Sequence, residues 1–117
     1  MLDLGCGPGY TSLDLAGLVA PGGRVVAVDA AERFIDHLKQ RQAALGLTNI
    51  ESDVMDAQKL EIALASVDIV YSRWVLCFVS APEAVIEGIT KVLRPGGILA
   101  VQEYANYATQ TLVPESE

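Results

Sequence analysis

The sequence contains few of the side chains that most catalytic sites use. Among 117 residues there are one histidine and two cysteines, and 6% of the residues are aromatic. The histidine, His37, lies in a stretch of helical pattern where we expect it to face solvent, so we do not expect it to act in catalysis. No apolar run approaches the ~20 residues that a membrane helix needs. No basic leader precedes an apolar segment either. We therefore expect neither a membrane span nor a signal peptide.

The two cysteines, Cys6 and Cys77, are far apart in the sequence. They show neither the spacing of metal ligands nor the density of a disulfide framework. We therefore expect two small buried thiols and no metal site. A reducing compartment, most simply the cytoplasm, fits this cysteine usage.

Positive charge is also scarce, with eight Lys and Arg residues against fifteen Asp and Glu residues and a net charge of -7. Proteins that bind nucleic acid through its phosphates carry the opposite balance. The charge therefore argues against nucleic acid as the main partner. It favours a small molecule.

Apolar residues, in contrast, make up 51% of the chain and come in short runs separated by Gly, Pro and charged residues. The length is that of one domain. Strands are expected at residues 1–4, 24–28, 49–54, 67–71 and 98–102. Helices are expected at residues 11–19 and 30–45, and again from a capping box at Ser80 to the turn at 94–97, with residues 58–66 ambiguous. This alternation predicts an α/β fold with three layers, a doubly wound parallel sheet covered by helices on both faces.

The first expected strand runs into a loop with glycine at alternating positions, Gly5, Gly7 and Gly9. The dinucleotide fingerprint would need a third glycine where Tyr10 stands, and the loop has no lysine of the phosphate-binding kind. Asp3, just before the loop, would repel a pyrophosphate but suits an ammonium or sulfonium group. The loop therefore favours a cationic, nucleoside-containing cofactor over a dinucleotide.

Further polar residues follow the other expected strands. Asp29, Asp56 and Ser72 all stand at or just beyond a strand end. Ligands of parallel α/β sheets bind beyond the carboxyl ends of the strands, where the strand order reverses. We expect these residues to lie near the glycine loop.

The segment Asp3-Leu4-Gly5-Cys6-Gly7-Pro8-Gly9 resembles motif I of the class I S-adenosylmethionine-dependent methyltransferases. Residues 26–29 are similar to that family's second strand with its ribose-binding acid, residues 67–70 to its fourth strand, and residues 92–97 to the turn before its fifth. The likeness continues to about Tyr104. The resemblance implies a Rossmann-like sheet of order 3-2-1-4-5, S-adenosylmethionine as cofactor, a binding core at residues 1–105 and a polar tail at residues 106–117.

The resemblance also implies a role for each matching position. The methionyl part would lie against Gly5, Gly7 and Gly9 and the main chain of Cys6, near Ser72, and Asp3 would orient the loop or meet the amino group. The ribose hydroxyls would donate to Asp29. The adenine would adjoin Ala30 and Ala57, and its amino group would donate to Asp56. Plainer interpretations stay open for several of these residues. Asp29 could cap a helix, and Asp53 competes with Asp56.

Arg73 and Trp74 follow the fourth strand, at the mouth where a methyl acceptor would bind. A surface salt bridge and a ring that covers the core are equally good interpretations of this pair. No Asn/Asp-Pro-Pro-aromatic motif stands there. Its absence weighs against methylation of nucleic-acid amino groups.

The chain also departs from the family at both ends, because the usual preceding helices and final antiparallel strands are absent. Strand five would then be an exposed apolar edge, and we expect a homodimer through it. The function expected is methyl transfer to a small-molecule acceptor. The alternatives are a catalytically impaired module that binds the cofactor or self-associates and, less favoured because of Tyr10 and Asp3, a nicotinamide-dependent oxidoreductase.

Overall fold

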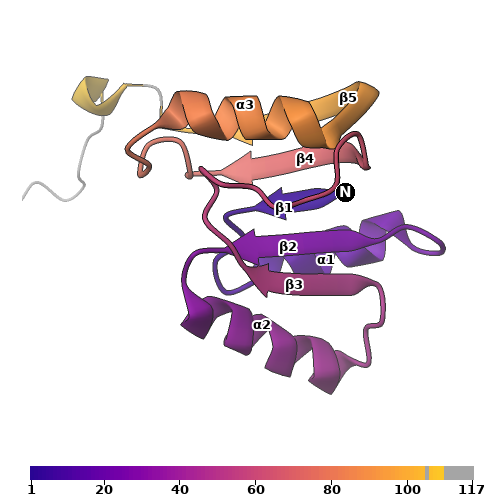
Figure 1. The fold of residues 1–117 in the computed structure, drawn as a ribbon. Coiled ribbons are helices and arrows are strands. Elements are labelled where there is room, and N and C mark those ends of the chain that lie inside the picture. The colour runs from indigo at the N-terminus through magenta and orange to yellow at the C-terminus, as the bar shows by residue number, and fades with distance from the viewer. Residues whose placement is uncertain (105, 110–117) are drawn as a thin grey trace, which may run out of the picture.

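The computed structural model of the chain describes residues 1–104 and 106–109, and its strands alternate with helices except that the third strand is followed directly by the fourth (Figure 1). The ambiguous residues 58–66 form no helix. Their bounds are β1 Leu2–Leu4, α1 Tyr10–Val19, β2 Val25–Asp29, α2 Glu32–Leu45, β3 Ile50–Val54, β4 Val67–Arg73, α3 Pro82–Val92, β5 Leu93–Gln102 and the short 3-10 helix Tyr107–Thr109. No helix in this part of the chain is both long and apolar enough to cross a membrane.

The five described strands form one parallel sheet in the order β3-β2-β1-β4-β5. The central strand, β1, pairs with β2 on one side and with β4 on the other. The chain therefore winds outward in one direction through β3 and then crosses back over β1. This reversal places a switch point at the carboxyl end of β1, where ligands of such sheets bind.

Two hydrophobic cores lie on opposite faces of the sheet, so the protein has the three layers that the sequence predicts. On one face α3 contributes Val85, Ile89 and Val92, which join buried side chains of β1, β2 and β4. On the other face α1 and α2 supply Ala16, Ile35 and Leu38, packed on β2 and β3. Figure 1 shows α3 on the side of the sheet opposite to α1. The fold expected from the pattern of the sequence is confirmed.

The ends of two helices differ from the expected ones. The capping box at Ser80 does not form, because its hydroxyl donates to Oε1 of Gln58 at 3.0 Å and the α3 N-cap is Ala81, which makes no side-chain capping bond. Helix α2 begins at Glu32 rather than at residue 30, since the carboxylate of Asp29 draws the backbone N–H of Ala31 into a turn at 2.8 Å.

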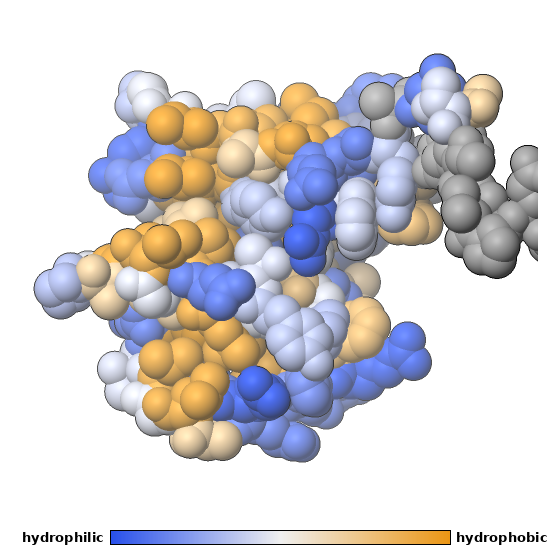
Figure 2. All heavy atoms as spheres, turned by 180° about the vertical axis from the view of Figure 1, so that it is seen from behind, coloured by the Kyte–Doolittle hydropathy of each residue, from blue (hydrophilic) through white to orange (hydrophobic). Residues whose placement is uncertain are grey.

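The turn expected at residues 94–97 also takes a different form. Leu93 already pairs with Val67, and pairing resumes with Ile98 opposite Ile69, so the turn lies within β5 as an irregularity of its register. β5 stands at the edge of the described sheet, and the side chains of Ile98 and Val101 are exposed. Figure 2, which shows the opposite side from Figure 1, has hydrophobic side chains gathered at the level of β4 and β5.

One smaller expectation about buried residues was wrong, and one about an exposed residue was met only in part. Cys77 is exposed, whereas Cys6 is buried as expected. His37 does not simply face solvent, because its Nε2 atom is shielded and its ring lies 6.2 Å from that of Tyr10. The expected tail at residues 106–117 falls largely outside the described residues.

Candidate functional site

The glycine loop leaves β1 at the switch point and is held against the neighbouring strand. The backbone N–H groups of Gly5 and Cys6 both donate to the carbonyl of Val28, at 2.8 and 3.0 Å. Gly5, Gly7 and Gly9 all have positive φ, at 70°, 54° and 84°. Residues with a Cβ rarely adopt this left-handed conformation. The alternating glycines therefore give a loop that turns tightly and carries almost no side-chain bulk.

The three glycines nevertheless differ in what surrounds them. A Cβ on Gly5 would overlap Val75, and one on Gly9 would lie 2.9 Å from the Cβ of Leu38. A Cβ on Gly7 would meet no atom within 4 Å. Gly9 is therefore needed for packing against α2 and as the N-cap of α1. Gly7 is the glycine that borders open space.

Asp29, at the end of β2, fixes the loop with both of its oxygens. Oδ2 accepts the N–H of Gly7 at 2.9 Å, and Oδ1 accepts the N–H of Ala31 at 2.8 Å. A carboxylate has about four acceptor positions, so Asp29 can still accept from hydroxyl groups of a ligand. It is not the N-cap residue of α2, which is Ala31. The plainer interpretation of Asp29 as a helix cap is wrong.

Asp3 lies beneath the loop and is only 2% exposed. Its Oδ2 accepts a short hydrogen bond of 2.6 Å from the hydroxyl of Ser12, on the first turn of α1. Burial raises the pKa of Asp3 above its ordinary value of 3.8, although the Ser12 hydroxyl and the charge of Arg73 oppose this. Ser12 was not predicted from the sequence, because nothing in the sequence alone pairs it with a residue on β1.

The thiol of Cys6 is 8% exposed and lies 3.5 Å from the carbonyl oxygen of Gly7. Burial, together with the charges of Asp3 and Asp29, raises its pKa to about 12. A thiol with such a pKa stays protonated at neutral pH and is a poor nucleophile. Cys6 can therefore contribute its main chain to the site but not a thiolate.

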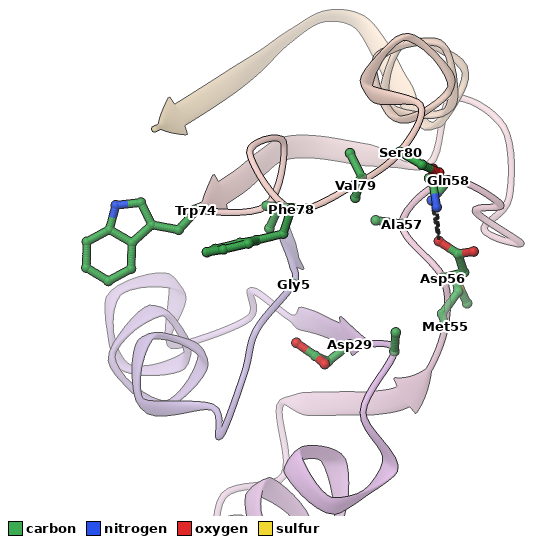
Figure 3. A pocket seen from close by; sticks show the side chains of 12 residues that line it. Gly5, Asp29, Met55, Asp56, Ala57, Gln58, Trp74, Phe78, Val79 and Ser80 are labelled. Atoms are coloured by element: carbon green, nitrogen blue, oxygen red, sulfur yellow. Dashed lines mark hydrogen bonds between the residues drawn. The ribbon is translucent and has the colours of Figure 1, made fainter. Parts of the chain in front are cut away.

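A hollow of about 520 Å³ opens beside the loop (Figure 3). Its lining comes from the loop, from the ends of β2 and β3 and from the segment after β4, and consists of Gly5, Asp29, Ala30, Met55, Asp56, Ala57, Gln58, Trp74, Val75, Phe78, Val79 and Ser80. Most of these side chains are apolar, and two carboxylates stand among them. The structure thus brings Asp29, Ala30, Asp56 and Ala57 together, although they are up to 28 residues apart.

Asp56 and Gln58 form the polar end of this hollow, as Figure 3 shows. Oδ1 of Asp56 accepts from the backbone N–H of Gln58 at 2.9 Å and from its side-chain amide at 3.3 Å. These two contacts lower the pKa of Asp56. Oε1 of Gln58 in turn accepts the N–H of Ala81 at 2.9 Å. Gln58, which sequence reasoning missed, therefore joins the loop after β3 to the start of α3.

A second hollow, of about 360 Å³, lies on the other side of Gly5. It shares four lining residues with the first, namely Gly5, Asp29, Trp74 and Phe78. Its remaining lining consists of Asp3, Cys6, Gly7, Pro8, Tyr10, Thr11, Phe34, Tyr71 and Arg73. The two hollows therefore adjoin along the glycine loop, and together they offer room for a ligand with two chemically different ends.

Two of the residues expected in the site line neither hollow. Ser72 is 1% exposed, and its hydroxyl has no hydrogen-bond partner among the residues that the structure describes. It sits on the α3 side of β4, paired with Leu4 of β1. Gly9 is the other, because it is covered by Leu38. The alternating glycine pattern and the strand-end rule suggested both positions, but neither rule indicates which way a residue faces.

Comparison with known proteins agrees with this geometry. The methyltransferase domain family matches the chain over residues 1–116. The chain belongs to this family. The resemblance to S-adenosylmethionine-dependent methyltransferases is therefore confirmed, and S-adenosylmethionine is the cofactor that this family membership indicates.

Two curated methyltransferases illustrate the range of relatives. The chain is 31% identical to the arsenite methyltransferase of Halobacterium salinarum over 108 residues, which cover 92% of the chain and 28% of that protein. It is 33% identical to the tRNA 5-carboxymethoxyuridine methyltransferase of Escherichia coli K12 over 106 residues, which cover 89% of the chain and 40% of that protein. The chain thus spans less than half the length of both methyltransferases.

Solved structures show the same core. A SAM-dependent methyltransferase from Aquifex aeolicus superposes with a TM-score of 0.81 at 27% identity, covering 86% of this chain and 53% of that one. The [4+2]-cyclase SpnF superposes with a TM-score of 0.82 at 27% identity, covering 87% of this chain and 37% of that one. The methyltransferase domain of this chain therefore has the family's sheet order, which the sequence predicted.

Proposed function

We propose that this chain binds S-adenosylmethionine along the glycine loop and transfers its methyl group to a small-molecule acceptor. The observation that carries the proposal is the position of Asp29. Its carboxylate is tied to the N–H of Gly7 and at the same time lines both hollows. One acid thus fixes the loop and faces the place where a ribose would lie between the two ends of the cofactor.

The lining residues fit the parts of that cofactor. The first hollow offers Ala30 and Ala57 as apolar surface for an adenine and the carboxylate of Asp56 as an acceptor for its amino group. The second offers the main chain at Gly7 and the negative charge of Asp3 for the methionyl part. When bound, S-adenosylmethionine supplies a methyl group on a positively charged sulfur, which complements the acids around the loop.

The contribution of the chain to the reaction is alignment. Holding a donor and an acceptor in line lowers a barrier by up to ~7–11 kcal/mol in favourable cases. Here the loop is fixed from two sides, by the Val28 carbonyl and by the Asp29 carboxylate. A loop held in this way keeps a bound ligand in one position relative to the second hollow.

The acceptor does not follow from the relatives, whose names include arsenite and a tRNA uridine. We infer a small molecule from the charge of -7, which disfavours a nucleic-acid backbone. The rival, a catalytically impaired module, is not favoured by the match to curated methyltransferases. The cyclase relative nevertheless shows that this fold is not limited to one chemistry, so activity needs a direct test.

Calorimetry with S-adenosylhomocysteine and with NAD provides the first test. We expect S-adenosylhomocysteine to bind and NAD not to bind at the same concentrations. A second experiment follows radioactive methyl transfer to a panel of small acids, amines and thiols. Transfer to one of them supports the enzyme, whereas binding without transfer to any of them would favour the impaired module. Absence of S-adenosylhomocysteine binding would contradict the proposed function.

We also propose that two copies of the chain associate through the free edge of β5. Ile98, Leu99 and Val101 are 59%, 36% and 42% exposed on this strand, and the edge carries backbone groups that a second strand can pair with. Light scattering at tens of micromolar should give twice the mass of 12.4 kDa. Ile98→Lys should yield monomer, while Leu18→Lys, at an exposed position on α1, should not. A monomeric wild-type chain would contradict the dimer.

Two further proposals concern the chain as a whole. Residues 1–105 are proposed to form the binding core and residues 106–117 a tail, so proteolysis of the native chain should remove the tail first. A reducing compartment, most simply the cytoplasm, suits a chain with only two cysteines, far apart in the sequence. Fractionation of the source cells would test the second of these proposals.

A further inference from the structure

Charge is unevenly placed around the two hollows. The first hollow is lined by the acids Asp29 and Asp56, and the second by Asp3 and Asp29. Among the described residues that line either hollow, Arg73 is the one basic residue. It ends β4 and points to the same side of the sheet as Asp3, because Tyr71, two residues earlier, pairs with Asp3. A single cation therefore stands at the mouth of the second hollow.

The acids near Arg73 already have partners, whereas its guanidinium group pairs with no carboxylate of the described part of the chain. Asp3 accepts from Ser12, and Asp29 accepts from Gly7 and Ala31. Within residues 1–104 and 106–109, Arg73 forms no salt bridge. Its guanidinium carbon lies 5.0 Å from the ring centre of Trp74. A guanidinium over an aromatic ring keeps its N–H donors directed outward along its edge.

Trp74 is held in a conformation that a bulky residue seldom adopts. Its φ is 56°, in the left-handed region that residues with a Cβ rarely adopt. Such conformations persist only where the surroundings enforce them, and they concentrate at functional sites. Trp74 is also 41% exposed. Its conformation is therefore not explained by a need to bury the indole.

The end of β5 supplies the contacts that enforce this conformation. The N–H of Trp74 donates to the carbonyl of Gln102 at 2.9 Å, and the N–H groups of Val75 and Leu76 donate to Oε1 of Glu103 at 2.8 and 2.9 Å. The indole stacks on the ring of Tyr104 at 5.2 Å and 7°. The turn after β4 is thus fixed by three hydrogen bonds and a ring, and it presents Arg73 and Trp74 in one arrangement.

Phe78 adds a second exposed aromatic ring to the same mouth. It is 78% exposed and lines both hollows. Figure 3 shows Trp74 and Phe78 extending to the same side of the segment after β4, beyond Gly5. Exposed aromatic faces bind flat apolar groups, and a free guanidinium edge binds a carboxylate through two parallel hydrogen bonds.

We propose that Arg73, Trp74 and Phe78 form the acceptor subsite and that the acceptor is a small aromatic carboxylate. The carboxylate lies against the outer edge of Arg73, and the ring lies against the exposed side chain of Phe78 and the edge of the Trp74 indole, whose ring already contacts Arg73 and Tyr104. Arg73 acts as a specificity residue that positions the acceptor. This inference rests on the proposed function, since it assigns the acceptor end of the same site.

The test uses the full chain loaded with S-adenosylhomocysteine and two probes of the same shape, benzoate and benzamide. Trp74 is the only tryptophan in the sequence, so intrinsic fluorescence reports this mouth alone, and calorimetry provides a second readout. We expect benzoate to bind at least about tenfold more tightly than benzamide, which is the ratio for one charge-assisted hydrogen bond.

Variants then assign the effect to the guanidinium group. Arg73→Gln should remove the preference for benzoate, and Arg73→Lys should retain part of it, because lysine keeps the charge but loses the paired donors. Arg94→Gln is the matched control, since Arg94 is a partly exposed arginine that pairs with Asp68 away from the site. The control should keep the full preference.

Three outcomes would overturn the inference. Equal binding of benzoate and benzamide by the loaded wild-type chain would show that the subsite does not recognise a carboxylate. A preference for benzoate that survives in Arg73→Gln would show that Arg73 does not bind the carboxylate. Weaker binding of S-adenosylhomocysteine, but not of 5′-methylthioadenosine, by Arg73→Gln would show that Arg73 holds the amino-acid carboxylate of the cofactor. In all three cases S-adenosylhomocysteine still binds the wild-type chain, so these failures differ from failure of the proposed function.

Discussion

The backbone N–H of Gly7 donates a hydrogen bond of 2.9 Å to the carboxylate of Asp29, 22 residues further along the chain. This contact joins the two parts of the site that lie on different strands. It ties the glycine loop to the end of β2, and it orients the same carboxylate that we propose meets the ribose. Binding and loop geometry should therefore depend on one side chain.

Replacing Asp29 should weaken cofactor binding. Asp29→Ala removes the proposed hydrogen bonds to the ribose and the contact with Gly7, so S-adenosylhomocysteine should bind about 1–3 kcal/mol less tightly. Asp36→Ala, an exposed acid on α2, serves as the control for charge and should leave the affinity unchanged. Calorimetry measures both. An unaltered affinity for Asp29→Ala would exclude this residue from the site.

The glycines of the loop should separate into packing and binding positions. Gly9→Ala should lower the free energy of unfolding, because the new methyl group would meet Leu38 and φ is 84°. Gly7→Ala should cost only the ~1–2 kcal/mol of a left-handed residue but should also weaken S-adenosylhomocysteine binding. Gly46→Ala is the control, with φ of 64° and no atom near the new Cβ. Equal effects of Gly7→Ala and Gly46→Ala on S-adenosylhomocysteine binding would contradict a binding role for Gly7.

Burial of Asp3 should make stability depend on pH. The folded chain keeps the Asp3 proton to a higher pH than the unfolded chain, in which the pKa is near 3.8. The contribution of Asp3 to the free energy of unfolding therefore falls as the pH rises above that value. Asp3→Asn keeps an acceptor for Ser12 but does not titrate. Urea unfolding should show that the free energy of unfolding of Asp3→Asn rises relative to that of the wild type between pH 4 and pH 7. A difference between the two that stays constant with pH would contradict this.

The hydroxyl of Ser12 should matter because it faces a buried carboxylate. Ser12→Ala leaves Oδ2 of Asp3 without the partner that holds it at 2.6 Å, and a buried group that loses its partner costs about 1–3 kcal/mol. Urea unfolding at pH 7 measures the loss. In the double variant with Asp3→Asn the cost should be smaller. Additive losses in the double variant would show that the two residues do not interact.

The two thiols should react very differently. Cys77 is exposed, whereas Cys6 is buried and its pKa is raised to about 12. At pH 8, iodoacetamide should label Cys77 of the native chain and reach Cys6 only after unfolding in urea. Peptide mass spectrometry distinguishes the two positions. Rapid labelling of Cys6 in the native chain would contradict the packing described for the loop.

Local and repeated patterns were sufficient to predict most of the fold. Short apolar runs alternate with helical stretches, and this alternation alone predicts a parallel sheet with helices on both faces. The positions of Asp29 and Asp56 followed from a general rule about strand ends, and both line the first hollow.

Contacts between distant segments could not be predicted in the same way. Ser80 was expected to cap α3, but its hydroxyl bonds to Gln58, 22 residues earlier. Ser72 follows the strand-end rule, yet it lines neither hollow, because its side chain is buried on the face of the sheet that α3 covers. Arg73 and Trp74 stood out in the sequence, but among the described residues Arg73 forms no salt bridge, and the Trp74 ring is 41% exposed rather than a cover of the core. Their arrangement depends on Glu103 and Tyr104, about 30 residues later.

The central claim is that an adenosyl ligand lies between Asp29 and Asp56 and against Gly7. The most direct measurement is a titration of the nitrogen-15-labelled chain with S-adenosylhomocysteine, followed by two-dimensional NMR of the backbone amides. We expect the largest shifts at Gly7, Ala30 and Ala57 and none at Gly46. Shifts that avoid these three amides, or a spectrum that does not change at millimolar ligand, would contradict the claim.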